Sequence, residues 1–369
     1  MRIAYVGIKG LPARFGADRA VEAIVRRLSK RHQISIYCSA RHTPANYCLG
    51  EIRLIRVPSI PGRFVHMPSV NLFSAFHSVH RGDYDLIHLH NIEASFVLPI
   101  LKTRFKTITT AHGRLTPGNR WGRAATALLR AMEYPFARWS DAATSVSSLH
   151  AQELGAQFHR AIRYIPNGID LAPEIDDIAA DAILQRYALP RGDFILFVSG
   201  RFIPLKGAHI LLDAYARLAN APRLVFVGDH SDSSGYIASL RARADARTIF
   251  IPFVEANPAL LGLMRASRLV VLPSLVEAMS MTLLEAASAG APLVCSDIPA
   301  NTAVLPTDSA RFFRSGDAAD LAEKLHWAID HADEMRAIGL RAQTWVRDHF
   351  NWDAIAKQYE SLYNEIVHR

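Results

Sequence analysis

Short apolar runs alternate along the whole chain with longer stretches in which apolar residues recur at helical spacing. The first run, residues 3–8, is followed by a stretch in which Val21, Ile24 and Leu28 share one helical face. Further strands of the first half are predicted at residues 34–39, 52–57, 85–90, 106–112, 142–147 and 162–167. Because strands that alternate with helices are joined by crossover connections, this pattern predicts a parallel sheet covered on both faces.

The alternation stops once, at residues 172–190, and then restarts. This segment is acidic, is bracketed by prolines and has no strand pattern, so we expect a linker with one short helix. The strands predicted beyond it are residues 194–200, 223–229, 248–253, 268–273 and 292–297. The helices predicted between and after these strands are residues 206–219, 234–244, 256–266 and 279–289.

This organisation predicts an α/β protein with two doubly wound, Rossmann-like domains. We place the N-terminal domain at residues 1–171, the linker at 172–190 and the C-terminal domain at 191–350. The amphipathic tail, residues 351–369, is expected to form a helix that packs back on the first domain. Since ligands of such sheets bind at the carboxyl ends of the strands, we expect the functional site in a cleft between the domains.

Composition places the chain among globular proteins. Half of its 369 residues are apolar and 21% are charged, values far from those of disordered chains. No apolar run reaches the roughly 20 residues that a membrane-spanning helix needs. Cys38, Cys48 and Cys295 lack metal-type spacing, and the first residues lack a signal-peptide pattern, so we expect a reducing, cytoplasmic location.

The net charge of +8 is unevenly distributed. Residues 1–170 hold 23 Lys and Arg against 10 Asp and Glu, a net charge of +13, whereas the remaining residues carry −5. Segments 60–81 and 118–139 of the basic half mix apolar and aromatic residues with basic ones, as do helices that lie on anionic lipid. We expect peripheral contact with an anionic membrane surface. The alternative is a basic surface that keeps the protein soluble over helices packed on their own sheet.

Two glutamates mark the segment with the most distinctive pattern, residues 273–292. Glu277 and Glu285 are separated by seven residues where a predicted strand gives way to a predicted helix beginning near Met279. Their carboxylates are then about 10–12 Å apart, which is too wide for the close pair of most glycosidases. This spacing suits two hydroxyl-rich ends of one ligand, with helix N–H groups between them for an anion. The alternative is an ordinary acidic residue at a helix start and one solvated glutamate.

Two cations follow the first strand of the C-terminal half. Arg201 comes directly after that strand, and Lys206 lies five residues further on, before a helix. A guanidinium and an ammonium at the mouth of a parallel sheet suit a diphosphate, because arginine binds phosphate through two N–H groups and lysine supplies a point charge. Either cation taken singly is equally explained as a solvated loop residue.

These motifs resemble the donor site of retaining glycosyltransferases of family 4, which have the GT-B fold. The resemblance rests on GRFIPLKG (200–207) and on the two glutamates, and it continues in IPNGID (165–170) and CSDIPAN (295–301). The opening loop GIKGLPARFG (7–16) is similar to that of bacterial rhamnosyltransferase-type enzymes that build surface polysaccharides.

The resemblance implies a role for each matching residue of the donor site. Arg201 and Lys206 would neutralise the diphosphate of a nucleotide-activated sugar. Glu285 would accept hydrogen bonds from the ribose, and Glu277 would hold hydroxyls of the transferred sugar beside the forming oxocarbenium ion. Backbone N–H groups of the following helix would touch phosphate or sugar, namely those of Ser280, Met281, Thr282 and Leu283.

In the first domain the resemblance implies that Gly16 lets the loop approach the donor phosphates. His112 would face the sugar or the acceptor, as a base or as an orienting group, and Arg14 would contact the acceptor. The sequence departs from the family at Ala17, where a second glycine is usual, so that either Asp18 or Arg19 takes the place of an acidic family residue.

Two pairs of possible metal ligands have simpler interpretations. Asp83 and Asp85 precede a predicted strand, at the end away from the expected cleft, and we interpret them as caps. His88 and His90 share one strand face without a third ligand at suitable spacing, so we expect a core or cleft-edge role. We therefore expect neither a metal nor another cofactor.

The sequence thus predicts an enzyme that transfers a hexose or deoxyhexose from a nucleotide-diphosphate sugar to a lipid-linked or polysaccharide-type acceptor, with retention and without a metal. The expected setting is bacterial surface glycan biosynthesis, on the inner face of the cell membrane. A nucleotide-sugar 2-epimerase on the same scaffold is one alternative, and a nucleotide-sugar-binding protein without catalysis is another. We find no nucleic-acid-binding motif.

Overall fold

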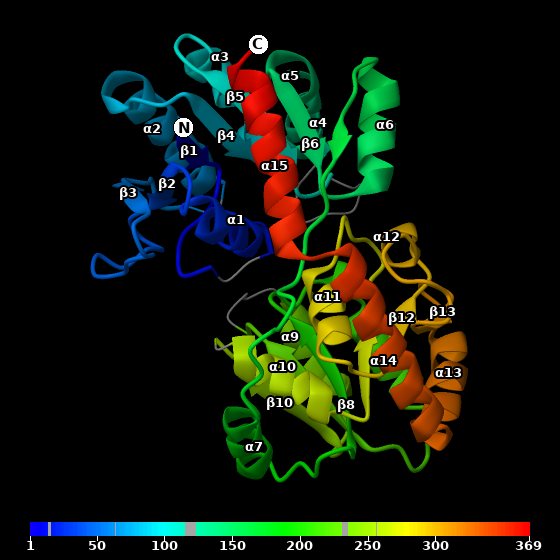
Figure 1. The fold of residues 1–369 in the computed structure, drawn as a ribbon. Helices are drawn as coiled ribbons and strands as arrows, with labels where there is room; N and C mark the ends of the chain where they lie inside the picture. The colour runs from blue at the N-terminus through cyan, green and yellow to red at the C-terminus, as the bar shows by residue number, and fades with distance from the viewer. Residues whose placement is uncertain (14–15, 63, 115–122, 231–234, 256) are drawn as a thin grey trace. The chain divides into compact units, whose positions relative to one another are not determined.

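The computed structural model describes residues 1–13, 16–62, 64–114, 123–230, 235–255 and 257–369 (Figure 1). The chain forms two compact units. The first unit comprises Met1–Gly168 together with Trp352–Arg369, and the second comprises Ile169–Asn351. Each unit has its own parallel sheet with helices, which confirms the predicted α/β class.

The first unit is built on a seven-stranded sheet in the order β3-β2-β1-β4-β5-β6-β7. Its strands are β1 (Arg2–Val6), β2 (Gln33–Ser39), β3 (Arg53–Val57), β4 (Leu86–His90), β5 (Lys106–Ala111), β6 (Ala142–Ser145) and β7 (Arg163–Tyr164). The longer helices are α1 (Gly16–Leu28), α2 (His66–Arg81), α4 (Arg123–Ala131), α5 (Glu133–Trp139), α6 (Ser148–Phe158) and α15 (Trp352–Val367), with the short η1 (Ile92–Val97) and α3 (Leu98–Leu101) between β4 and β5. The strand order reverses between β1 and β4.

The core of the first unit follows from the apolar pattern. The predicted helical face of α1 is buried, and so is every residue of β4, including its two histidines. Helix α15, red in Figure 1, brings Tyr359 and Tyr363 into this core. The hydroxyls of Tyr363 and Tyr5 are 2.9 Å apart, so a polar contact as well as apolar burial holds α15 against β1.

The second unit is built on a six-stranded sheet in the order β10-β9-β8-β11-β12-β13. Its strands are β8 (Phe194–Ser199), β9 (Arg223–Gly228), β10 (Thr248–Pro252), β11 (Leu269–Leu272), β12 (Leu293–Ser296) and β13 (Arg311–Phe313). Its helices are α7 (Asp177–Arg186), η2 (Pro204–Lys206), α8 (Ala208–Tyr215), α9 (Gly235–Arg243), α10 (Asn257–Ala266), α11 (Met281–Ser288), α12 (Pro299–Thr302), α13 (Ala318–Asp330) and α14 (Ala332–His349). The strand order reverses between β8 and β11.

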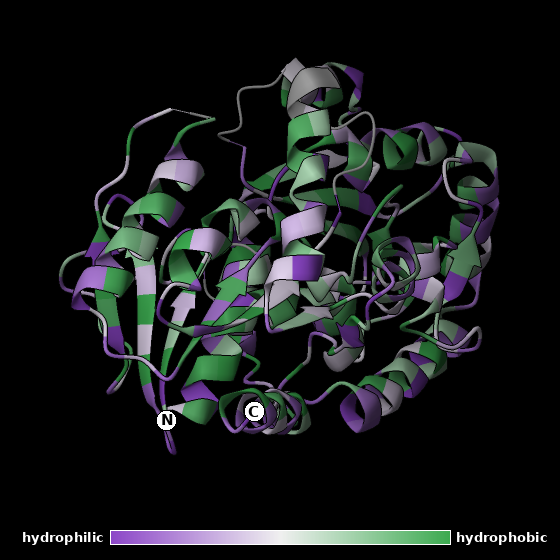
Figure 2. Cartoon of the chain, turned by 90° about the horizontal axis from the view of Figure 1, so that it is seen from above, coloured by the Kyte–Doolittle hydropathy of each residue, from purple (hydrophilic) through white to green (hydrophobic). Residues whose placement is uncertain are grey.

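Strand β13 is an element that the sequence pattern does not predict. It has three residues, of which only Phe313 is buried, so it leaves no apolar run in the sequence. It pairs in parallel with β12 at the sheet edge. Hydrophilic and hydrophobic residues, purple and green in Figure 2, both occur along the helices, as expected where a helix packs one face on a sheet.

The acidic segment 172–190 contains helix α7, which packs against α10 within the second unit. The Asp176 side chain caps α7 by accepting a hydrogen bond from the backbone N–H of Ala179 at 2.9 Å. The backbone N–H of Asp176 donates to the carbonyl of Pro258 at 3.1 Å. Across the described ranges, no helix combines the length and the apolar character required to cross a membrane.

Candidate active site

The loops after β8 and β11 are in direct backbone contact at the point where the strand order of the second unit reverses. The backbone N–H of Leu275 donates to the carbonyl of Leu205 at 2.8 Å. Gly207 has φ +73°, and a Cβ there would lie 1.8 Å from the carbonyl oxygen of Pro273. Only glycine fits this close approach. Ligands of doubly wound sheets bind at this kind of reversal, so the two loops border a natural binding position.

Lys206 and Glu277 meet across these two loops. The Lys206 ammonium lies 2.6 Å from Oε1 of Glu277, and the Ser274 hydroxyl donates to the same oxygen at 2.8 Å. The Glu277 side chain is 11% exposed and that of Lys206 is 32% exposed. Two donors therefore fix one carboxylate oxygen, while the ammonium keeps further N–H groups toward solvent for a second anion.

Helix α11 begins beside this ion pair. Ser280 is its N-cap, and the serine hydroxyl accepts a hydrogen bond from the backbone N–H of Leu283 at 3.2 Å. The helix begins at Met281, two residues later than the sequence pattern predicts, because the serine cap determines the start. Glu285 therefore lies in the second turn, where its side chain is buried. The free N–H groups and the dipole of the first turn favour an anion.

Arg201 lies just beyond β8, at the same edge of the sheet. It is exposed, and its carbonyl oxygen accepts a hydrogen bond from the Ser199 hydroxyl at 2.6 Å. The second unit thus carries all the donor-site residues that the sequence analysis names outside the first domain. They lie on the β8 loop, on the β11 loop and on α11, and the structure brings Lys206 into direct contact with Glu277.

In the first unit, His112 follows β5 and contacts the last residue of β4. Nε2 of His112 lies 2.9 Å from Nδ1 of His90, and the two rings are stacked. His112 is partly exposed, whereas His90 is fully buried. Burial lowers the pKa of His112 to about 4 and the pKa of His90 well below its usual value, so both rings are neutral at neutral pH.

His88 lies beside the His90–His112 pair and contacts α15. Its Nδ1 lies 2.7 Å from the Tyr363 hydroxyl, and its Nε2 lies 2.6 Å from the Thr110 hydroxyl. Burial lowers the pKa of His88 to about 3. His88 is thus a core residue whose two nitrogens are both bonded, which is one of the two roles expected for the His88–His90 pair.

The loop after β1 meets the end of β4 where the strand order of the first unit reverses. Gly7 has φ +98°, and a Cβ there would lie 2.2 Å from the carbonyl oxygen of His90. The Asn91 amide donates to the carbonyl of Gly7 at 2.9 Å. Gly16 is the exposed first residue of α1, and Arg14 lies outside the described residues. Asp18 is buried, and its carboxylate accepts a hydrogen bond from the backbone N–H of Lys9 at 3.1 Å.

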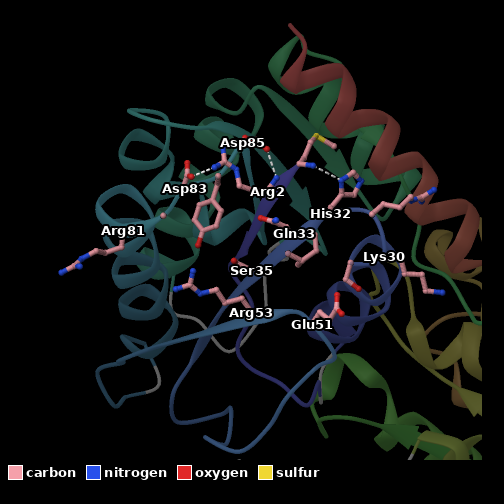
Figure 3. Close-up of a pocket in the computed structure, with 16 residues that line it drawn as sticks. Arg2, Lys30, His32, Gln33, Ser35, Glu51, Arg53, Arg81, Asp83 and Asp85 are labelled. Atoms are coloured by element: carbon pink, nitrogen blue, oxygen red, sulfur yellow. Dashed lines mark hydrogen bonds and ion pairs between the residues drawn. The ribbon is translucent and has the colours of Figure 1, made fainter.

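The Asp83–Asp85 pair is bound by an arginine. Arg2 forms ion pairs with both carboxylates, and its backbone N–H donates to Asp85 at 2.7 Å (Figure 3). Among the described residues there is no group of three or more histidines, cysteines or carboxylates that could hold a metal. A groove of about 850 Å³ lies beside this pair, but Lys30 and Arg81 extend away from each other at its two ends, so these two cations do not converge on one ligand.

Three residues of these sites are absent from the sequence-based site prediction. Ser274 is a plain serine in a loop, and only its bond to Glu277 reveals a role. His90 was expected to have a core or cleft-edge role, and only the structure shows its bond to His112. Asn91 follows a strand with φ +74°, and an asparagine directly after a buried strand was the one available signal for such a turn.

Two glycosyltransferase family models match consecutive parts of the chain. The Glycosyltransferase Family 4 model matches residues 16–173, and the model for Glycosyl transferases group 1 matches residues 180–345. The first match lies mainly in the first unit, and the second lies entirely in the second unit, where Lys206, Glu277 and Glu285 are found.

The relatives that the chain matches are also named as glycosyltransferases. The chain is 29% identical over 245 residues to the D-inositol 3-phosphate glycosyltransferase of Jonesia denitrificans, which covers 59% of this chain and 56% of that protein. It is 25% identical over 312 residues to the MMP alpha-(1->4)-mannosyltransferase of Mycolicibacterium hassiacum, which covers 78% and 72%. The chain therefore spans little more than half the length of the first of these relatives.

The fold also matches that of solved structures. HepE from Anabaena, in complex with UDP and glucose, superposes with a TM-score of 0.80 at 19% identity, over 99% of this chain and 100% of that one. The two family matches and this superposition agree with the two parallel sheets described above. The chain therefore belongs to the glycosyltransferases of the GT-B fold, with a family 4 domain followed by a group 1 domain.

Proposed function

We propose that the protein is a retaining, metal-independent glycosyltransferase that uses a nucleotide-diphosphate sugar. The observation that carries the proposal is the Lys206–Glu277 pair at the strand reversal of the second unit, beside the N-terminus of α11. A cation and a helix N-terminus suit the diphosphate, and a fixed carboxylate suits the sugar. The UDP and glucose bound by HepE, a protein of the same fold, support this donor class.

In the proposed reaction the bond between the anomeric carbon and the leaving phosphate oxygen breaks, and negative charge develops on the diphosphate. Lys206, Arg201 and the first N–H groups of α11 would stabilise that charge without reorganisation. Glu277 would hold sugar hydroxyls beside the developing oxocarbenium ion, since Ser274 and Lys206 already fix its Oε1. Glu285 would bind the ribose.

The acceptor hydroxyl would attack from the face that the diphosphate leaves, which retains the anomeric configuration. Its proton would pass to the departing phosphate oxygen. Gly16 would allow the loop of the first unit to approach the phosphates, and His112 and Arg14 would contact sugar or acceptor. The likeness of residues 7–16 to rhamnosyltransferase-type enzymes supports a deoxyhexose or hexose donor and an acceptor of bacterial surface glycan biosynthesis.

An acceptor linked to a lipid would bring the first unit to the inner face of the cell membrane. Helix α2 carries exposed apolar side chains at Leu72, Phe73 and Phe76, with Arg81 in its last turn. Helix α4 exposes 66% of Leu128. Exposed aromatic side chains on a basic unit fit an anionic lipid surface. Residues 118–122 of the second predicted membrane segment lie outside the described residues.

Calorimetry with UDP, GDP, ADP and dTDP tests the donor site. We expect one of these nucleotides to bind, and Lys206→Ala and Glu285→Ala to lower its affinity about 10- to 100-fold, the effect of one charge-assisted contact. Lys324→Ala is the matched control, because Lys324 is a lysine of the same unit paired with Asp320 and Glu323. Unchanged affinity in both site variants would contradict the assignment.

A transfer assay with the matching sugar nucleotide tests the reaction. Product should form only when a lipid-linked acceptor is present, and EDTA should leave the rate unchanged. Product from the donor alone would identify an epimerase, and nucleotide binding without any product would identify a binding protein.

A further inference from the structure

The His90–His112 hydrogen bond determines which nitrogen of His112 carries a proton. The bond joins Nδ1 of His90 to Nε2 of His112 at 2.9 Å, and both rings are neutral, so a single proton lies between these nitrogens. Each neutral imidazole has one N–H and one bare nitrogen. Whichever ring donates, the proton positions of both rings are therefore fixed together.

The other nitrogen of His90 decides between the two arrangements. Nε2 of His90 is buried and has no hydrogen-bond partner. The ring centroids of His88 and His90 are 4.1 Å apart, but both nitrogens of His88 are already hydrogen-bonded to other residues. Tyr5 stacks nearly parallel on His90 with 5.7 Å between the ring centres. A stacked ring offers no acceptor to an N–H, because an imidazole N–H points within the plane of its own ring.

If His112 donated to His90, the proton of His90 would sit on Nε2 as a buried N–H without an acceptor. If His90 donates, only a lone pair of Nε2 is left unmatched. Buried N–H groups without partners are rarer in proteins than buried acceptors without partners, so the second arrangement is favoured. His112 then accepts at Nε2 and carries its own proton on Nδ1.

We infer that His90 is a positioning residue that holds His112 in the Nδ1–H tautomer, so that His112 presents a hydrogen-bond donor to a substrate oxygen and does not act as a general base. This inference rests on the proposed function for its consequence in sugar transfer. His112 is partly exposed, and no described group bonds its Nδ1, which is therefore available to a ligand. The low pKa of His112 agrees with this role, because a base must take up a proton.

The tautomer can be read directly by long-range ¹H–¹⁵N NMR of the full-length chain labelled with ¹⁵N-histidine, with His112→Gln to assign the signals. We expect His112 to show a protonated Nδ1 and a bare Nε2. In His90→Phe the signals of His112 should shift toward the Nε2–H form, and in His90→Asn, whose amide can donate, they should return. His150→Phe is the matched control, since His150 is another buried histidine of the first unit with an unpartnered Nδ1.

In the transfer assay kcat/KM should fall about three- to tenfold in His90→Phe, the effect of one neutral hydrogen bond, and recover in His90→Asn. A wild-type spectrum with the proton of His112 on Nε2 would overturn the inference, as would a His112 spectrum that His90→Phe does not change. The spectrum decides the inference even if no sugar is transferred, whereas absent transfer with the expected spectrum would contradict only the proposed function.

Discussion

Both units place polar side chains where the strand order of their sheet reverses, but these side chains are charged in the second unit and neutral in the first. In the second unit, the reversal between β8 and β11 holds an ion pair, Lys206 with Glu277, that solvent reaches in part. In the first unit, the reversal between β1 and β4 lies beside His90 and His112, which are neutral rings in a mostly buried cluster. The same kind of parallel sheet can therefore carry either an ion pair or a pair of neutral, hydrogen-bonded side chains at its strand reversal.

The difference follows from what each environment allows. An ammonium and a carboxylate retain their charges when they are paired and part of the ammonium stays hydrated. Imidazoles surrounded by tyrosines and apolar strands lose their protons instead, because burial penalises the charged form. A charged unit suits a diphosphate, and a neutral unit suits the hydroxyls of a sugar or an acceptor.

Gly207→Ala is expected to have the largest effect, because it disrupts the charged site of the second unit. The methyl group would lie 1.8 Å from the carbonyl oxygen of Pro273 at a φ that alanine disfavours, so the β8 loop must separate from the β11 loop. We expect the free energy of unfolding to fall by about 3 kcal/mol or more. Nucleoside diphosphate affinity should fall more than tenfold, since Lys206 moves with the loop. Denaturant titration and calorimetry measure the two effects.

Gly192→Ala controls for the backbone angle alone. Gly192 also has φ +73° and lies in the second unit, but a Cβ there meets nothing within 4 Å. We expect a loss of about 1 kcal/mol in stability and no change in nucleotide affinity. Equal effects of the two substitutions would show that the contact between the loops does not matter.

The charged site could be proposed from the sequence because its residues gather at the ends of two apolar strands of one half, although each of them taken singly also fits a solvated loop residue. Arg201, Lys206 and Glu277 stand next to apolar strands, and long charged side chains are rarely buried without partners. Every residue of β8 and of β11 is buried, and these mainly apolar runs made the strand ends easy to locate. The start of α11 was placed two residues early, because the Ser280 cap overrides the apolar pattern.

The neutral site could be predicted only in part. His112 was identified through a family resemblance, whereas the sequence left a core and a cleft-edge role open for His90, which is buried and contacts the partly exposed His112. What the sequence could not show is that the end of β4 lies beside the end of β5, which places Nδ1 of His90 against His112. Strand β13 was missed for the same reason: pairing, and not an apolar run, defines it.

Lowering the pH should destabilise the first unit more than the second. The pKa of His112 falls from 6.5 to about 4 on folding, and that of His88 falls to about 3. Between these values and 6.5, the unfolded chain binds protons that the folded unit does not. The free energy of unfolding should therefore decrease as the pH falls from about 6.5 to 4, by about 1.4 kcal/mol per pH unit for each such histidine.

Hydrogen exchange measured by mass spectrometry at pH 7 and pH 5, corrected for the intrinsic exchange rate, separates the units. Peptides from β4 and β5 should lose more protection at pH 5 than peptides from β8 and β9. His209 and His230 of the second unit also have lowered pKa values, but both are partly exposed, so a smaller loss is expected there. Equal losses of protection in both units would contradict the expectation that the buried histidines make the first unit more sensitive to acid.

The smallest expected effect concerns the outer surfaces, where the basic first unit is proposed to touch lipid. Arg81, in the last turn of α2, is exposed and follows the exposed Phe73 and Phe76. Arg81→Ala should weaken binding to phosphatidylserine vesicles about fivefold at low salt, because one basic residue near an anionic surface contributes about 1 kcal/mol. Vesicle co-sedimentation measures the affinity.

Arg186→Ala is the matched control, since Arg186 occupies the last turn of α7 in the second unit and is likewise exposed. It should leave vesicle binding unchanged if the lipid contact belongs to the first unit. Raising the salt concentration should weaken binding of the wild type and diminish the difference between wild type and Arg81→Ala, because salt screens the attraction. Equal losses from both arginines would mean that net charge, and not the face formed by α2, attracts the protein to lipid. The donor site of the second unit would be unaffected by that result, because none of its residues lies on that face.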